Sequence, residues 1–368
     1  MITFPFLFLE LNGYNTDTLK TFIVTFDPDG GTSVAGQTVE KENNVIEPTV
    51  PIKLNDKGGL YLGTPPDYIF IGWFNGNTQW NFNSPVTSNI TLKARWTQPV
   101  PINLAEIVGD NILYKTFSYL DDKDLTEEYT LLLDSDITYG YMTTPSNYNL
   151  TIIGIGGEKT IRDNGDEPLR IRIGSNVPRA ILTIGKNITL NSSDERGAIS
   201  VFNGNFTMLD GSKIVADFGV SLSNSNNYPD TFFDMNGGII TGEVRISGVD
   251  TTQLTLSGNA TIEVLSSRSA WGIPKIIVSS DWVGSVGELN LTGAYSIDEL
   301  KNYFQDKILI QGNSGYTLTQ ADITRFPLGG FNSQRSPTDP TILETKPISD
   351  THKLELDVLN NAIKLIAK

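Results

Sequence analysis

Residues 203–214 read NGNFTMLDGSKI, a short alternating run enclosed by two turns that are rich in Asn, Asp and Gly. Within the run, Phe206 and Met208 fall on one face and Thr207 falls on the other. A half-buried β-strand has this period of two residues, because successive side chains point to opposite sides of the backbone. The stretch therefore predicts one strand with an apolar inner face, closed at each end by a turn.

The same unit recurs along the second half of the chain, each time behind an asparagine, at residues 149–152, 187–190, 205–208, 259–262 and 290–292. Several of the spacings are close to multiples of about 18 residues, a period expected for coils that stack on one another. Asparagine tolerates the left-handed turn conformation, so it suits the corner before each strand. The pattern predicts a parallel solenoid in which the following point inward: Ile188, Leu190, Phe206, Met208, Ile262 and Leu291. It also predicts turns at Asn187, Asn205 and Asn259.

The composition agrees with a mostly β protein and excludes several classes of function. The chain has 368 residues, with 34 Gly and 18 Pro that separate short runs rich in Val, Ile, Thr and aromatic residues. A formal charge of −15 repels phosphate backbones, so we expect no nucleic-acid partner. No apolar run reaches the length of a membrane span. Cysteine is absent, which excludes disulfides and thiolate chemistry.

The first 20 residues form a segment of their own, which begins with the apolar stretch MITFPFLFL at residues 1–9. Such a stretch is typical of a signal-peptide core, but no Lys or Arg precedes it and no small-x-small cleavage site follows. Two interpretations stay open: a remnant of a signal peptide with a truncated or misassigned start, or a disordered or edge-strand terminus.

Residues 21–97 form the next unit. A strand at 21–26 runs into the turn DPDGG at 27–31, whose Pro fixes φ and whose glycines accept positive φ. Residues 90–96 alternate again, with apolar positions on one face and Thr, Lys and Arg on the other. The sequence TQPVP at 97–101 then predicts a linker.

The order F-x-V-x-F-D-x-x-G-G, G-W-F, W-x-F and P-V-T-x-N-I-T-L-x-A-x-W in this unit resembles the Listeria-Bacteroides repeat, the internalin-type B repeat. The structural signature of the resemblance lies at Phe26, Gly30, Gly31, Gly72, Trp73, Trp80 and Trp96. It implies a small β-grasp-like domain of a kind that occurs in exported bacterial proteins, often at the cell surface. The long segment 52–67 departs from the usual short connection. We expect Trp73, Phe74, Trp80, Phe82 and Trp96 to form the core of the repeat, in preference to a platform on which sugars stack.

The second half resembles the right-handed parallel β-helix, or pectin-lyase-like, repeats of bacterial surface proteins. The predicted fold class is therefore all-β, a β-grasp-like repeat followed by a right-handed parallel β-helix with a capping C-terminal region. Ser296-Ile-Asp-Glu299 has the form of a capping box and predicts one short helix, and residues 353–366 predict a closing hairpin. The predicted units are 1–20 (N-terminal segment), 21–97 (repeat), 98–129 (linker and N-terminal cap), 130–294 (parallel β-helix) and 295–368 (C-terminal cap).

The sequence offers no credible catalytic set. Its single histidine, His352, excludes sites that need two, and it lies at the entry of the last predicted strand, where we expect a solvated side chain. Of the acidic residues, Asp134 and Asp136 are the best candidates for calcium ligands, although solvated loop acids account for them better. We expect no cofactor and no bound metal.

Three arginines are the candidate ligand-binding residues. In LRIRI at 169–173, Arg170 and Arg172 share one face, and Arg245 repeats the pattern in VRI at 244–246. Stacked coils would bring these side chains into a basic stripe suited to carboxylates of acidic sugars. The alternative is a solvent face that carries charge for solubility.

These observations lead to a non-catalytic, adhesin-like interaction protein, secreted or at the cell surface, with the solenoid as scaffold and the repeat as spacer or docking module. The partner would be an unidentified protein or glycan on a host, a neighbouring cell or a matrix. One alternative is a polysaccharide lyase or glycoside hydrolase that acts on acidic polysaccharide. The other is a purely structural module of a larger surface array.

Overall fold

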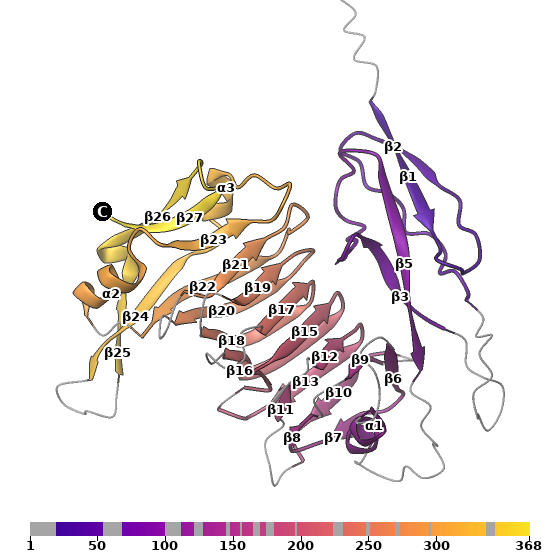
Figure 1. The fold of residues 1–368 in the computed structure, drawn as a ribbon, viewed down its shortest axis with the longest axis horizontal. Helices are drawn as coiled ribbons and strands as arrows, with labels where there is room; N and C mark the ends of the chain where they lie inside the picture. Colours follow the sequence, from indigo (N-terminus) through magenta and orange to yellow (C-terminus); the bar gives the residue numbers. More distant parts are fainter. Residues whose placement is uncertain are drawn as a thin grey trace, which may run out of the picture.

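The computed structural model describes residues 20–53, 68–99, 112–120, 128–144, 148–154, 157–164, 170–173, 180–195, 197–223, 231–247, 251–268, 273–293, 296–335 and 343–368. The segment 1–19, most of the long connection 52–67 and residues 100–111 of the predicted linker and cap lie outside this part. The chain folds into an N-terminal repeat domain and a β-solenoid of about six turns over residues 129–292 (Figure 1).

The repeat is a mixed sheet in the order β2-β1-β5-β3-β4. Its central strands β1 and β5 are parallel, while β2 and β3 flank them antiparallel. Alternation in β1 places Phe22, Val24 and Phe26 in the core, as the pattern predicts. The strands are β1 (Thr21–Asp27), β2 (Gln37–Glu40), β3 (Ile69–Asn75), β4 (Thr78–Gln79) and β5 (Ile90–Pro99).

The solenoid consists of two parallel sheets that face each other across one core. The first sheet contains, in spatial order, β6 (Tyr129–Leu133), β9 (Asn149–Gly154), β12 (Ala180–Ile184), β15 (Gly204–Leu209), β17 (Thr231–Asn236), β19 (Thr252–Leu256), β21 (Lys275–Val278) and β23 (Ile308–Gly312). The second contains β7 (Ile137–Thr138), β10 (Lys159–Arg162), β13 (Ile188–Ser192), β16 (Ser212–Ser223), β18 (Ile239–Ser247), β20 (Thr261–Arg268), β22 (Ser285–Thr292) and β24 (Leu328–Arg335), with β8 (Tyr141–Thr143), β11 (Arg170–Ile173) and β14 (Ile199–Val201) alongside.

The core is built from rows of apolar side chains in register from coil to coil. One row runs through Leu150, Leu182, Phe206, Phe233 and Leu254, all fully buried. A single coil has one apolar face and cannot bury it alone, so stacking of coils supplies the burial. All six residues predicted to point inward are buried, and the pairs between successive coils are parallel, which confirms the predicted solenoid.

The three asparagines predicted to lie in turns do not all do so. Asn187 lies in a turn with φ +62°, and Asn259 also lies in a turn, as predicted. The prediction for Asn205 was wrong: it is the second residue of β15, paired with Ile181 and Phe232. Gly204, with φ +142°, takes the corner instead.

From the fourth coil onward, the second and third strands of each coil merge into one long strand with a bend. The register between β16 and β18 shifts around Phe218, and the register between β18 and β20 shifts between Ile240 and Glu243. Gly242 makes the bend possible, because it has φ +117° and a Cβ there would lie 1.6 Å from the Ala216 carbonyl oxygen.

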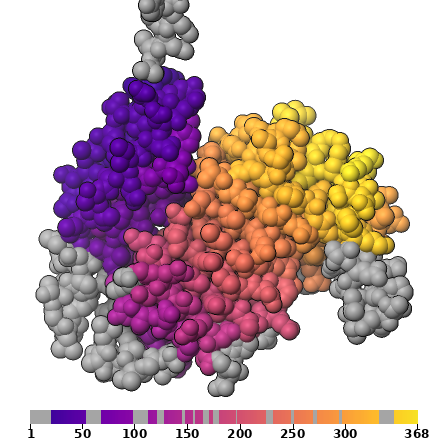
Figure 2. All heavy atoms as spheres, turned by 180° about the vertical axis from the view of Figure 1, so that it is seen from behind, coloured from indigo at the N-terminus to yellow at the C-terminus, as the bar shows by residue number. Residues whose placement is uncertain are grey.

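The repeat is joined to the solenoid by a strand and not by a linker at residues 98 and 99. β5 runs to Pro99, and its last residues pair in parallel with β6, so the repeat sheet continues into the first solenoid sheet. The Thr130 hydroxyl donates to the Thr97 hydroxyl over 2.5 Å, and the Asp210 N–H donates to Gln79 over 3.4 Å. The repeat stands against the first coils in both views (Figures 1 and 2).

Side chains that point out of both units are buried at this junction. Phe74 lies outside the repeat's own core cluster and is 2% exposed, and Ile153 and Leu209 face outward from the solenoid yet are 3% and 4% exposed. Arg95 stacks on the Phe74 ring at 4.2 Å. Burial lowers the pKa of the Arg95 guanidinium, and the Glu128 carboxylate at the start of the solenoid opposes this lowering.

Both ends of the solenoid are closed. Helix α1 (Ile112–Leu120) buries Leu113, Phe117 and Leu120 in the solenoid core. At the far end lie α2 (Ile297–Phe304), α3 (Gln320–Ile323), β25 (Leu343–Pro347), a 3₁₀ helix (Ile348–Asp350) and the hairpin of β26 (His352–Asp357) and β27 (Ala362–Ala367). Ser296 caps α2 by accepting a hydrogen bond from the Glu299 N–H, as predicted.

His352 is fully buried at the start of β26, so the expectation of a solvated side chain was wrong. Its Nδ1 lies 2.7 Å from the Thr351 hydroxyl. Burial, with a smaller contribution from the Lys301 charge, lowers the pKa of the imidazole.

Candidate functional site

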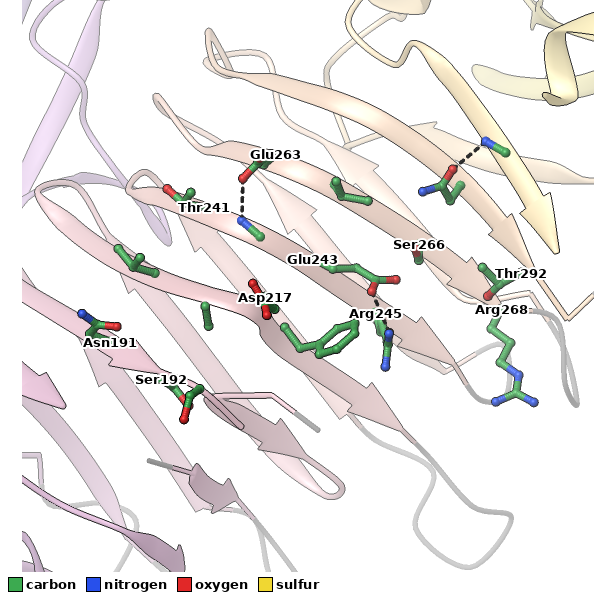
Figure 3. A pocket seen from close by; sticks show the side chains of 18 of the residues that line it. Asn191, Ser192, Asp217, Thr241, Glu243, Arg245, Glu263, Ser266, Arg268 and Thr292 are labelled. Carbon is green, nitrogen blue, oxygen red and sulfur yellow. Dashed lines mark hydrogen bonds and ion pairs between the residues drawn. The ribbon is translucent and has the colours of Figure 1, made fainter. Parts of the chain in front are cut away.

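The candidate site is an open groove of about 990 Å³ along the bend of the second solenoid sheet (Figure 3). It crosses six neighbouring strands, β13, β16, β18, β20, β22 and β24, the last of them at Gly330. Its polar side chains, in order along the coils, are Asn191, Ser192 and Ser193, then Asp217, then Thr241, Glu243 and Arg245, then Glu263, Ser266 and Arg268, and finally Asn290 and Thr292. The bend forms the groove, because the bulged residues tilt the two halves of each long strand toward each other.

Arg245 is held in the middle of the groove by two contacts. Its guanidinium lies 3.5 Å from the centroid of the Phe218 ring, and its Nε donates to Glu243 over 2.9 Å. The Arg245 side chain is nevertheless 46% exposed. A guanidinium has five donors in a fixed fork, so donors other than Nε remain available to a ligand.

Two of the three groove carboxylates are occupied by structural contacts. Glu243 accepts from Arg245, and Glu263 accepts from the Gly242 N–H over 2.8 Å (Figure 3). The Glu263 contact gives a hydrogen-bond partner to the Gly242 N–H, which the bulge removes from the hydrogen bonds between strands. Asp217 is exposed and has no hydrogen-bond or ion-pair partner among the described residues.

The arginines do not form the predicted stripe. Arg172 and Arg245 occupy the same row, but Ser200 and Ser221 lie between them. Three strand spacings of about 4.8 Å separate the two backbones by about 14 Å. Only Arg245 of the three predicted arginines lines the groove.

Arg170 and Arg172 belong to a separate surface on the first coils. Arg170 donates to the Ser200 hydroxyl over 3.1 Å and lies 5.7 Å from the Tyr141 ring, and Arg172 stacks on Phe202 at 4.3 Å. Hydrogen bonds, first with Thr143 and then with Arg172, lower the pKa of the Tyr141 phenol.

The two acids proposed as calcium ligands accept hydrogen bonds from a backbone N–H and from a neighbouring side chain. Asp136 accepts from the Thr160 N–H over 2.9 Å, and Asp134 accepts from the Ser135 hydroxyl. Among the described residues, no three His, Asp or Glu side chains gather as a metal site would require.

The signature residues of the repeat have structural roles. Phe26, Trp73 and Trp96 are buried, and Phe26 packs edge to face on Trp73 at 4.9 Å. A Cβ at Gly31 would lie 2.5 Å from the Trp96 ring, whose Nε1 donates to the Pro28 carbonyl over 2.9 Å.

The other signature positions complete this picture. Gly30 has φ +85° in the turn, and a Cβ at Gly72 would meet Gln79 at 2.6 Å. Trp80 and Phe82 are partly buried against the core. Phe74 is the exception to the core prediction, because it is buried outside the repeat's core cluster and carries the Arg95 guanidinium on its ring.

Sequence reasoning missed Asp217, Phe218, Glu243, Glu263 and Arg268. Glu243 and Glu263 are 20 residues apart and each precedes a valine, in GEVR and IEVL, so a repeated acid at a bulge was the available signal. The bulge itself cannot be read from the alternation, because it is the place where alternation fails.

The fold and the groove define a β-solenoid protein with an N-terminal repeat domain. Residues 22–57 and 61–95 match the Listeria-Bacteroides repeat domain, so this module is a repeat of that family. The comparisons with curated proteins and with solved structures found no match for the chain. Within the described ranges, no helix has the length and apolar character needed to cross a membrane.

Proposed function

We propose that the chain is a non-catalytic, adhesin-like interaction protein, secreted or at the cell surface, that holds an extended ligand in the solenoid groove. The observation that carries this proposal is the groove itself, which is open along its length and offers polar groups from five successive strands. Listeria-Bacteroides repeats occur in surface proteins, which supports the location.

The charges in the groove favour binding over catalysis. A lyase or hydrolase needs carboxylates that are free to exchange protons or to attack the substrate. Here Glu243 neutralises Arg245 and Glu263 satisfies a backbone N–H, which leaves Asp217 as the carboxylate without such a contact.

The alternative enzyme has one observation in its favour. Arg245 shares a groove with three carboxylates, and such a grouping is what an enzyme acting on acidic polysaccharide would need. The test is therefore to incubate the full chain with neutral and uronic polysaccharides, with and without calcium, and to measure both retention and product formation.

We expect retention by at least one glycan or matrix surface without new reducing ends or unsaturated products. Turnover that is lost in Asp217→Asn would replace the proposal with an enzyme. Absence of retention by any glycan, cell or matrix surface would leave the chain as a structural module.

A further inference from the structure

We infer that the repeat is a force-bearing connector, in which β1 and β5 form a clamp that resists tension between the N-terminal side of the chain and the solenoid. This function goes beyond ligand binding, because it does not depend on what the groove holds. Its first support is the order of the strands. β1 is the first strand of the repeat and β5 is the last, and the two are parallel neighbours. The chain therefore enters the repeat at one end of this pair and leaves it at the other end (Figure 1).

Tension along the chain loads this pair in shear. A pull at Lys20 draws β1 back along its own axis, and a pull beyond Pro99 draws β5 forward along the same axis. Because the strands are parallel, the two pulls are opposite in direction. The four registered pairs from Val24–Ile90 to Asp27–Lys93 then have to separate together. They could separate one at a time only if both strands were pulled at the same end.

β1 is held on both edges and on its inner face. Its other edge pairs with β2 over four more residues, Thr21 to Val24. The inner side chains of the clamp belong to one core cluster: Phe22, Val24 and Phe26 from β1, and Leu92, Ala94 and Trp96 from β5. A slip of β1 by one residue along β5 would turn its apolar face away from the core. The core therefore opposes the same movement that the hydrogen bonds between the strands oppose.

Further contacts close both ends of the clamp and connect it to the solenoid. At the start, the Ile23 N–H donates to the Asn89 side-chain oxygen over 2.9 Å. At the far end, the Trp96 Nε1 donates to the Pro28 carbonyl over 2.9 Å. β5 then pairs with β6 through its last two residues, so the loaded strand itself enters the first solenoid sheet.

The test is to stretch single molecules of the full chain between two introduced cysteines and to measure the unfolding force. The chain contains no cysteine of its own, so each introduced pair defines both points of attachment. Lys20→Cys with Tyr114→Cys loads the clamp in shear. Tyr114 is 60% exposed on α1, and attachment there keeps the solenoid coils outside the stretched part of the chain.

Ser33→Cys with Tyr114→Cys is the control geometry. Ser33 is exposed and follows the end of β1, so a pull there acts on the same end of both clamp strands and opens the pairs one by one. Unfolding of the repeat is recognised by the length of chain released, up to about 260–280 Å for residues 20–99 and about 220–240 Å for residues 33–99, at about 3.3–3.6 Å per residue.

The unfolding force should be about two to four times higher in the shear geometry than in the control geometry, because four pairs break together in the first and singly in the second. Equal forces in the two geometries would overturn the inference.

Two matched variants separate the clamp from the general stability of the repeat. Val24→Ala and Val86→Ala make the same truncation at fully buried positions of one core cluster, but Val24 lies in β1 and Val86 lies outside the strands. Both should lower the melting temperature of the repeat. Only Val24→Ala should lower the force in the shear geometry, since forced unfolding depends on the contacts that break at the barrier. Equal losses of force in the two variants would overturn the inference.

Discussion

The junction between the repeat and the solenoid gives the sharpest prediction, through Phe74→Ala. Phe74 is 2% exposed, faces away from the repeat core and carries Arg95 on its ring. Complete burial of a phenylalanine contributes about 1.5–3 kcal/mol, and truncation of a packed one costs about 3–5 kcal/mol when the cavity cannot collapse. A junction can relax, so we expect a loss of about 2–4 kcal/mol of docking free energy.

This loss appears as a change in cooperativity. In the parent protein, the shared strand pair and the buried junction should make the repeat and the first coils unfold together. In Phe74→Ala the repeat should unfold first, with a midpoint about 8–32 °C lower, since a loss of about 2–4 kcal/mol shifts the midpoint of a domain of this size by about 4–8 °C per kcal/mol. Calorimetry, together with fluorescence of Trp73, Trp80 and Trp96 in the repeat, separates the two events.

Tyr303→Ala serves as the control, because Tyr303 is 39% exposed on α2 at the other end of the solenoid. It should leave both transitions in place. Limited proteolysis adds a second measurement, in which residues 96–99 should resist cleavage in the parent. Two independent transitions in the parent, unchanged by Phe74→Ala, would show that the repeat is a flexibly linked domain and refute the docking argument.

The remaining predictions concern the cores and the single histidine. Trp73→Ala should unfold the repeat, since loss of a buried aromatic side chain costs on the order of 3–5 kcal/mol of unfolding free energy. A variant that keeps its melting temperature but loses binding to a glycan or matrix surface would instead assign Trp73 to recognition. Met208→Asp places an unpaired charge in the solenoid core, so it should destabilise the coils on both sides of β15 together. Faster amide hydrogen exchange in one coil alone would contradict this expectation. His352 should titrate below its ordinary pKa of 6.5 by NMR, where one histidine gives one signal. The unfolded state then takes up the proton first as pH falls, so unfolding free energy should decrease from pH 7.5 to 5.5 more in the parent than in His352→Gln; equal slopes would contradict this.

The interior of the solenoid was predictable because apolar and polar residues alternate along each short strand. Phe206 and Met208 are two residues apart, so both had to face the core once one did. The position of Asn205 was not predictable in this way, since either Gly204 or Asn205 satisfies a turn, and the choice depends on pairing with Ile181. The resemblance located the repeat, but it did not indicate that β5 continues into the solenoid sheet through Pro99.

The groove was less accessible to sequence reasoning, because it depends on register between distant coils. Arg172 and Arg245 do share a row, as their apolar neighbours required, but the sequence did not show how many coils intervene. The groove acids sit at bulges, where the two-residue period breaks. At the bend of β18, the backbone of Gly242 closely approaches the Ala216 carbonyl, and this packing depends on the neighbouring coil.

The two sheets of the solenoid thus serve different contacts. The repeat continues the first sheet, and on the outer face of that sheet Thr130, which donates to Thr97 of the repeat, and Thr151 are both buried. The groove belongs to the second sheet, on strands β13 to β24. A repeat docked in this way holds the solenoid in a fixed orientation and leaves the groove open. An extended ligand in the groove has its direction set relative to the repeat, so a change in the junction should alter how the protein presents this ligand and leave the affinity of the groove for it unchanged.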